Sequence, residues 1–258
     1  MSEEEKSDVL VEARDGVLVI TINRPEARNA LTGAVARGIA EAVDRLDADD
    51  ELRVGVLTGA GGTFCSGMDL KGFLAGDLPI VEGRGLGGIT ERPPRKPLVA
   101  AVEGYAVAGG LELLLACDLV VAAETARLGV PEVKRGLVAG AGAAMLLPQR
   151  IPPAIALELL LTGDPITAAR AAELGLVNRV VPEGGALDGA LALAARVAAN
   201  GPLAVAVTKQ VALQSPDWSH AERWARQGEL MGTVFASADA AEGATAFAEK
   251  RAPRWTGK

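Results

Sequence analysis

The stretch EGYAVAGGLELLLACDLVVAAETARLGVPE, residues 103–132, decides the fold. Small and aliphatic residues lead to a break at Gly109-Gly110, and Glu112 is then the only charged side chain between Tyr105 and Asp118. This spacing predicts a strand, a glycine break and a buried helix with Glu112 about one turn inside. Because burial raises the pKa of an unpaired carboxylate, such a group suits proton transfer near neutral pH. A structural glutamate paired with an arginine fits the same pattern.

The composition limits the class of protein. A chain of 258 residues holds one large domain or two modest ones. Hydrophobic residues make up 49% of it but aromatic ones only 3%, which predicts a core of Ala, Val, Leu and Gly. The net charge of -7 argues against nucleic acid as a partner, since phosphates require a basic face. No apolar run approaches the roughly 18 residues of a membrane span.

The start of the chain and its cysteines indicate the compartment. MSEEEKSD, residues 1–8, is acidic and lacks the pattern of a signal peptide. Cys65 and Cys117 have no CxxC or CxxH neighbour, which fits a reducing environment. We therefore expect a soluble cytoplasmic protein.

Strands and glycine loops alternate in the first half of the chain. Thr32 is a plausible N-cap for a helical pattern over residues 29–47, and residues 76–95 indicate a mobile excursion. Two strand–loop–helix units, one ending in a short helix near 69–75 and one carrying Glu112, suggest a wound parallel or mixed sheet. The predicted strands are 17–22, 54–58, 98–102 and 118–122.

From about residue 140 the chain is predicted to be mainly helical. A short strand is expected at residues 177–181, and the last sixty residues form a helical appendage to an α/β core. Its apolar faces either pack on another subunit or dock on the same chain. The helices are predicted at 140–149, 154–161, 167–174, 186–199, 203–214, 218–235 and 239–249.

Several motifs fail on their context. Residues 83–88 match GxGxxG, but Pro93 prevents the helix that a dinucleotide fingerprint needs. No phosphate-binding GxxxxGK[ST] loop occurs, and no GxSxG accompanies His220, the single histidine, which is expected in a helix with a surface or packing role. One histidine and two distant cysteines do not make a zinc site, so no metal is expected.

A carboxylate pair and two glycine turns remain. Glu132 follows Pro131, and a strand that leaves the Glu112 helix and returns would bring both carboxylates to one small molecule. Neighbouring carboxylates split their pKa values, which provides an acid and a base. The turns at residues 67–69 and 109–110 offer unpaired N–H groups at helix starts, as in an oxyanion hole. Glycines that merely permit tight turns explain each turn taken alone.

The sequence resembles the crotonase superfamily, the enoyl-CoA hydratase and isomerase family, over nearly its full length. The tail FAEKRAPRWTG and the run LPQRIPPAIALELLLTG are most similar to carnitinyl-CoA dehydratases within that family. The matching segments are INRPEARNAL (22–31), VLTGAGGTFCSGMDLK (56–71), KPLVAAVEGYAVAGGLELLLACDLVVAAE (96–124), LGVPEVKRGLVAGAG (128–142), LTGDPITAARAAELGLVNRVV (161–181) and AFAEKRAPRW (246–255).

The resemblance implies an α/β fold, a spiral of ββα units over residues 1–196 with a helical trimerisation region over 197–258. Family members are trimers or dimers of trimers. Ala108 departs from the resemblance where a third glycine is usual, and Ala139 where a proline is common, which bears on the acyl group.

The resemblance also assigns roles to residues. Met68 and Gly109 would donate the two N–H groups of the oxyanion hole, and Glu112 and Glu132 would be the hydratase carboxylates. Gly140 would help to hold the water. Phe247 and Lys250 of a neighbouring subunit would meet the adenine. The path of coenzyme A would be lined by Ala27, Arg28, Ser66, Asp69 and Lys71.

The resulting hypothesis is reversible hydration of a 2-enoyl-CoA thioester. Coenzyme A is then part of the substrate, and no separate cofactor is expected. Two alternatives stay open: carnitinyl-CoA dehydration or another lyase or isomerase reaction on CoA thioesters, and a non-catalytic acyl-CoA-binding or assembly protein.

Overall fold

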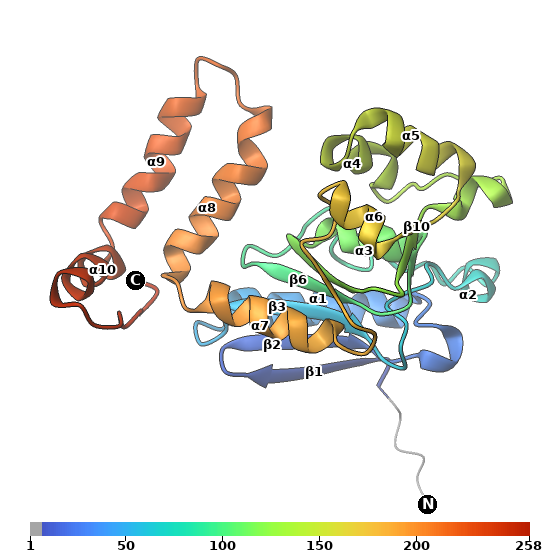
Figure 1. Cartoon of the computed structure of the whole chain (residues 1–258), viewed down its shortest axis with the longest axis horizontal. Helices are drawn as coiled ribbons and strands as arrows, with labels where there is room; N and C mark the ends of the chain where they lie inside the picture. The colour runs from blue at the N-terminus through green and yellow to red at the C-terminus, as the bar shows by residue number, and fades with distance from the viewer. Residues whose placement is uncertain (1–6) are drawn as a thin grey trace, which may run out of the picture.

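The computed structural model describes residues 7–258, so most of the acidic start MSEEEKSD lies outside the described residues. Within this range the main sheet has six strands in the order β1-β2-β3-β6-β8-β11. Figure 1 labels β1, β2, β3 and β6 of this sheet. Only β1 is antiparallel to its neighbour, so the sheet is mixed, as predicted. The strands are β1 (Val9–Arg14), β2 (Val17–Ile22), β3 (Val54–Gly59), β6 (Leu98–Val102), β8 (Leu119–Ala123) and β11 (Arg179–Val181).

Helices cover both faces of this sheet. Alternate residues of β2 divide between them: Leu18, Ile20 and Ile22 join the core under α1 (Gly33–Ala48), while Val17 joins the cluster under α7 (Ala186–Ala198). Strands covered on both sides are apolar throughout, which explains the continuous runs of Val, Leu and Ala in β3 and β6.

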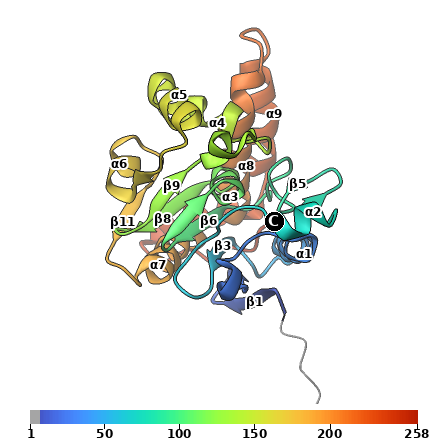
Figure 2. The ribbon, with the colours of Figure 1, turned by 90° about the vertical axis from the view of Figure 1, so that its right-hand side faces the viewer.

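A second sheet makes the chain a spiral of ββα units. Its order is β10 (Ile166–Thr167), β9 (Arg127–Gly129), β7 (Tyr105–Val107), and a parallel bridge from Cys65 to Ala106 extends it. Each turn of the spiral places one strand in the main sheet, an extended segment in the second sheet, and then a helix. The helices α2 (Leu70–Leu74) and α3 (Gly109–Ala116) and the 3-10 helix η2 (Pro131–Arg135) end three such turns (Figure 2).

The last helices project from the body. After α4 (Ala143–Arg150), α5 (Pro153–Thr162) and α6 (Ala168–Glu173), the chain passes through α7 and bends by 106° into the helical segment that begins with α8 (Pro202–Gln214). Then α9 (Arg223–Phe235) returns beside α8, and α10 (Ala238–Glu249) follows the C-terminal end of α9, away from the sheet (Figure 1). The predicted helical appendage is present as α8, α9 and α10. The predicted boundary between residues 196 and 197, which divides it from the core, stays a prediction.

Several sequence predictions need correction. The helix predicted over 29–47 begins only at Gly33, after the Thr32 N-cap whose hydroxyl accepts from the Val35 N–H. The helix predicted over 218–235 begins only at Arg223, because η3 (Ser215–Asp217) and a turn precede α9. His220, which was predicted to lie in a helix, is an exposed residue of that turn. Residues 76–95, expected to be a mobile excursion, contain the hairpin of β4 (Ile80–Val81) and β5 (Gly85–Leu86) and place Ile89 fully in the core.

Three further features of the described residues bear on the motifs and on the cysteines. The GxGxxG segment forms part of the β4–β5 hairpin and its following turn, and no dinucleotide crossover follows it. Cys65 and Cys117 are buried free thiols. Between residues 7 and 258 no single helix is long and apolar enough to cross a membrane; α7 and the helical segment after it reach that length only as a pair with a 106° bend.

Candidate active site

Glu112 lies in the first turns of α3, where all its neighbours are apolar. Its side chain is only 4% exposed. The carboxylate accepts hydrogen bonds at Oε1 from two backbone amides at the start of α4, Ala141 N at 2.7 Å and Ala143 N at 3.2 Å. No ion pair to Glu112 occurs in the part of the chain that the structure describes. Backbone amides therefore take the place of the arginine that the alternative interpretation required.

The pKa of Glu112 is raised above its ordinary value. Burial is the largest cause, and the negative charge of Glu132 raises the pKa further. The Ala143 and Ala141 amides oppose this shift because they stabilise the anion. The two carboxylates are therefore close enough to interact, although twenty residues separate them in the chain.

Glu132 reaches the same region from η2, directly after Pro131. Strands β8 and β9 carry the chain away from α3 and back, as the sequence predicted. Burial raises the pKa of Glu132, against the opposing effects of its own backbone N–H and of Arg135. Its Oε2 is buried and has no hydrogen-bond partner among the described residues. An unpartnered buried oxygen is costly and is typical of a site built for a ligand or a water.

Two free amides lie in neighbouring turns, and one of them starts the helix that carries Glu112. The N–H groups of Met68 and Gly109 donate no backbone or side-chain hydrogen bond within residues 7–258. The two turns approach closely: a β-carbon on Gly67 would meet the Gly109 nitrogen at 3.2 Å and the Ala108 methyl at 2.7 Å. Only glycine therefore fits at position 67, where φ is +95°. The arrangement provides two donors that can bind one oxygen.

Backbone pairing holds both turns in place. Leu31 N–H donates to the Gly67 carbonyl at 2.8 Å, and Asp69 N–H donates to the Leu31 carbonyl at 2.9 Å. Ala108 adopts φ 53° and ψ -129°, a conformation that non-glycine residues rarely take and that costs about 1–3 kcal/mol. The departure from a third glycine at this position is thus accompanied by strain next to the Gly109 amide.

The predicted coenzyme A residues gather around these turns. Ser66 N–H donates to the Arg28 carbonyl at 3.1 Å, which brings Ala27 and Arg28 beside the Met68 turn. Arg28 and Lys71 are exposed. Their roles in binding coenzyme A stay predictions.

Asp69 has a structural task. Its carboxylate caps α2 by accepting from Lys71 N and Gly72 N, and it also accepts from Arg24 at 3.1 Å. The Gly72 amide, first among several causes, lowers its pKa. These bonds fix the turn that follows Met68, and a contact of Asp69 with coenzyme A stays a prediction.

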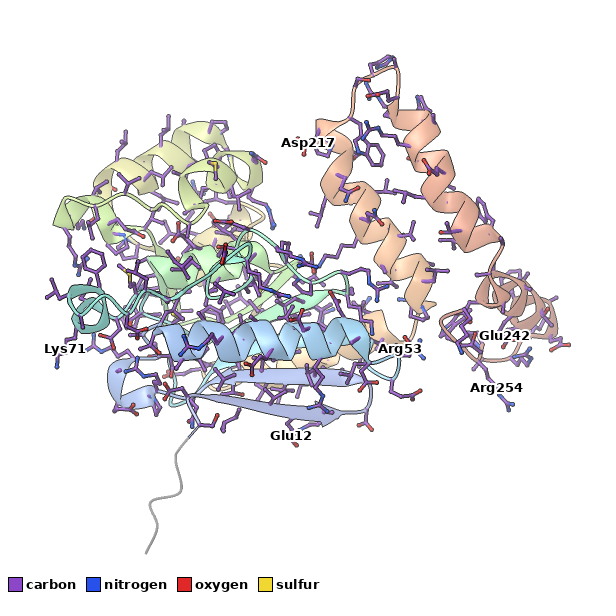
Figure 3. The ribbon with its side chains drawn as sticks, turned by 180° about the vertical axis from the view of Figure 1, so that it is seen from behind. Glu12, Arg53, Lys71, Asp217, Glu242 and Arg254 are labelled. Atoms are coloured by element: carbon purple, nitrogen blue, oxygen red, sulfur yellow. The ribbon has the colours of Figure 1, made fainter. Side chains whose placement is uncertain are left out.

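The remaining predicted residues are Gly140, which adjoins Glu112, and Phe247 and Lys250, which lie on α10 and at its end. Gly140 is exposed and directly precedes the Ala141 amide that binds Glu112. Phe247 is 88% exposed on α10, and Lys250 is the left-handed C-cap of that helix. Figure 3 shows Lys71 on one side of the folded molecule and the α10 region, marked by Glu242 and Arg254, on the opposite side. Phe247 and Lys250 therefore lie far from the Met68 turn of their own chain.

Sequence reasoning missed the amides of Ala141 and Ala143. The GAGAA run that holds them is visible in the sequence, but its turn toward Glu112 depends on how α4 packs. Sequence reasoning also missed Arg24, whose guanidinium donates hydrogen bonds to the Asp69 carboxylate and to the Ala30 carbonyl. In the described range no group of three or more His, Cys, Asp or Glu side chains is arranged to hold a metal ion.

Comparison with known proteins identifies the family. Residues 12–258 match the enoyl-CoA hydratase/isomerase family. The chain belongs to this family.

Individual relatives cover almost the whole chain. It is 44% identical to an enoyl-CoA hydratase, EchA19, of Mycobacterium tuberculosis over 96% of each chain. It is 40% identical to a carnitinyl-CoA dehydratase of Proteus mirabilis over 95% of this chain and 97% of that one. The crystal structure of the enoyl-CoA hydratase EchA1 of Mycobacterium marinum superposes with a TM-score of 0.97 at 60% identity, covering 98% and 100% of the two chains. The predicted family resemblance and spiral fold are confirmed.

Proposed function

We propose that this member of the enoyl-CoA hydratase/isomerase family adds water reversibly to the double bond of a 2-enoyl-CoA thioester. The family match and the enoyl-CoA hydratase relatives support this function. The observation that carries it is the pairing of a buried carboxylate, Glu112, with the half-buried carboxylate of Glu132, both with raised pKa values, together with two free backbone amides, one of which starts the helix that carries Glu112. Coenzyme A enters as part of the substrate, and the proposed steps need no further cofactor.

The two glutamates divide the proton transfers. Two amides at the start of α4 favour the anion of Glu112, which makes it the base. The Oε2 of Glu132 has no donor to stabilise a charge, which makes Glu132 the acid. Since the charge of Glu132 raises the pKa of Glu112, we assign one shared proton to the pair.

Water addition begins with binding of the thioester in the oxyanion hole. The thioester oxygen accepts hydrogen bonds from the Met68 and Gly109 amides, which stabilise the negative charge that forms on it. A water molecule near Gly140 gives its proton to Glu112, and its oxygen bonds to the β-carbon. The electrons of the double bond move toward the thioester, and the α-carbon takes the proton of Glu132. The reverse sequence eliminates water.

Substitution of each glutamate tests these roles. We expect Glu112→Gln and Glu132→Gln to lower kcat for crotonyl-CoA by about 10²–10⁴ with the fold intact, since each removes a general acid or base. The loss of absorbance of the conjugated thioester measures the rate, and circular dichroism measures the fold. Glu158→Gln, an exposed position on α5, is the matched control. Hydration at the wild-type rate by either active-site variant would refute that residue's role.

Dehydration of carnitinyl-CoA is the second candidate. The identity of 40–41% to carnitinyl-CoA dehydratases, over 95–97% of this chain, favours it. The same chemistry applies, because water leaves across the same two carbons. Comparison of kcat/KM for a panel of acyl-CoA thioesters decides between the substrates. Binding of every thioester with turnover of none would instead indicate a non-catalytic acyl-CoA-binding protein.

The site is proposed to be completed by a second subunit in a trimer or a dimer of trimers. Within one chain, Glu242 of α10, the helix that carries Phe247 and is capped by Lys250, lies on the opposite side of the molecule from Lys71 (Figure 3). We therefore assign Phe247 and Lys250 to contacts with the adenine of a substrate bound to the neighbouring subunit. In that subunit, the path of coenzyme A is proposed to be lined by Ala27, Arg28, Ser66, Asp69 and Lys71.

A further inference from the structure

Cys65 lies where the two amide-bearing turns meet. Its backbone N–H donates to the Tyr105 carbonyl at 2.9 Å, and its carbonyl accepts from Val107 N–H at 3.1 Å. These bonds pair the segment before Met68 with β7, the strand before Gly109. One residue thus connects both halves of the proposed oxyanion hole through the main chain.

The thiol of Cys65 makes a further contact inside the turn. The Gly67 N–H donates to its Sγ at 3.4 Å, and the side chain is fully buried. A thiol is a weak acceptor, yet it satisfies an amide that would otherwise be buried without a partner. The Gly67 amide is thus bonded within the turn, whereas the next amide, that of Met68, donates to no group of the described residues.

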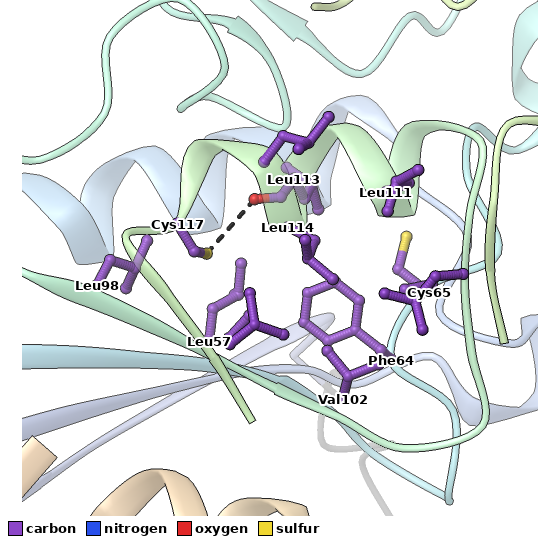
Figure 4. Packing of buried hydrophobic residues seen from close by; sticks show 14 of the residues in the cluster. Leu57, Phe64, Cys65, Leu98, Val102, Leu111, Leu113, Leu114 and Cys117 are labelled. Atoms are coloured by element: carbon purple, nitrogen blue, oxygen red, sulfur yellow. Dashed lines mark hydrogen bonds between the residues drawn. The ribbon is translucent and has the colours of Figure 1, made fainter. Parts of the chain in front are cut away.

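Cys65 also packs against the first turn of α3. A β-carbon on Gly110 would come within 2.2 Å of the Cys65 carbonyl oxygen and 3.0 Å of its β-carbon. Figure 4 shows the Cys65 side chain directed toward the start of α3, close to Leu111. A change in the size or position of this side chain therefore acts on the helix start that presents the Gly109 amide.

We propose that Cys65 is a positioning residue for the oxyanion hole, in which its thiol fixes the turn that presents the Met68 amide at a set distance from the Gly109 amide. This inference rests on the proposed hydratase function. Burial raises the pKa of the Cys65 thiol to about 12, so the group stays neutral and does not act as a nucleophile.

The test compares three variants with crotonyl-CoA as substrate. Cys65→Ala removes the acceptor, and we expect kcat to fall about tenfold to a hundredfold with KM within about twofold, since a misplaced donor is lost mainly in the transition state. Cys65→Ser keeps an acceptor on the same β-carbon and should restore kcat to within about threefold. Cys117→Ala is the matched control, because this second buried thiol lies at the opposite end of α3 and bonds only the Leu113 carbonyl (Figure 4).

A spectroscopic readout separates positioning from packing. The carbonyl stretch of the thioester in bound crotonyl-CoA, measured by difference infrared spectroscopy, should lie lower than in free crotonyl-CoA and move back toward the free value in Cys65→Ala alone. If Cys65→Ala keeps the wild-type kcat and carbonyl frequency, or if Cys117→Ala changes them equally, the positioning role is wrong. Absence of hydration by the wild type would overturn the hydratase function instead, while the carbonyl frequency still tests Cys65.

Discussion

Glu112 and Glu132 show how a site is built from groups that folding alone does not favour. Burial penalises both anions, and neither has a cation bound to its carboxylate in the described residues. Two backbone amides stabilise the Glu112 anion in part, whereas no donor among the described residues stabilises a charge on Glu132 Oε2. Such residues lower stability in exchange for reactivity, so their titration should be visible in the free energy of unfolding.

Glu132→Gln should therefore change stability with pH in a defined direction. The pKa of Glu132 is raised above 4.5, so between 4.5 and its folded value the native state binds more protons than the unfolded state. Wild-type stability then falls as pH rises through this window, and Gln does not titrate. We expect the variant to become more stable than the wild type as pH increases from 4 to 8, measured by urea unfolding at fixed protein concentration.

Glu242 supplies a control of opposite sign. Its hydrogen bond with Arg251, with further contacts, lowers the pKa of Glu242 to about 2. The native state therefore holds fewer protons than the unfolded state between about 2 and 4.5, and this stabilisation is complete above 4.5. Glu242→Gln should thus be less stable than the wild type at neutral pH. A Glu132→Gln difference that is constant with pH, or that follows the Glu242→Gln trend, would contradict the burial argument.

At the scale of elements, periodicity found long segments and missed short ones. The strands at 17–22 and 98–102 match the structure because they are continuous apolar runs covered on both faces. The edge strand β1 was missed, since its outer residues are exposed and it alternates little. Strands β7, β9 and β10 have only two or three residues and exist through pairing with each other, which no local pattern records.

Residues of the candidate active site were likewise predicted where a local sequence pattern marks them. Glu112 was visible because a single charge interrupts an apolar helix, and the glycines marked both turns. The family resemblance supplied Glu132 and the donor amides as a set. The Ala141 and Ala143 amides were not predicted, because they bind Glu112 from 29 and 31 positions away. The role of Cys65 was not predicted either, because it depends on main-chain pairing with Tyr105 and Val107 and on packing against Gly110.

Lys209 joins α8 to the core and carries a prediction for that element. Its ammonium donates to the Pro94 and Lys96 carbonyls and to Asp118 at 2.6 Å, with the two charged side chains only 10% and 18% exposed. Lys209→Met leaves these acceptors without their donor, and we expect the free energy of unfolding to fall by about 2–4 kcal/mol. Urea unfolding at fixed protein concentration measures it.

Lys134→Met is the comparison for this measurement. Lys134 pairs with Asp164, but both side chains are well exposed, at 46% and 72%. The loss of such a surface pair costs about 0–1 kcal/mol. Equal destabilisation by the two variants would mean that the buried contacts of Lys209 do not anchor α8.

For the whole molecule, the projecting helices expose more apolar surface than one chain covers. Between α8 and α9 lies an apolar hollow of about 350 Å³, lined by Val207, Val211, Met231 and Phe235 among others. Phe235 and Trp224 are each 71% exposed, and Phe247 is 88% exposed. Exposed apolar surface of this kind is typical of protein interfaces. It favours packing on another subunit over docking on the same chain, the two alternatives that the sequence left open for these helices.

Light scattering after gel filtration should therefore give the mass of a trimer or hexamer. Phe235→Lys places a charge on the α8–α9 surface and should shift the protein toward the monomer, with helix content unchanged by circular dichroism. Leu10→Lys, at a 47% exposed position on the edge strand β1, should keep the wild-type mass. Because Phe247 and Lys250 are assigned to the neighbour's substrate, the dissociated variant should also show a raised KM for crotonyl-CoA. A monomeric wild type with full activity would contradict both the assembly and this shared site.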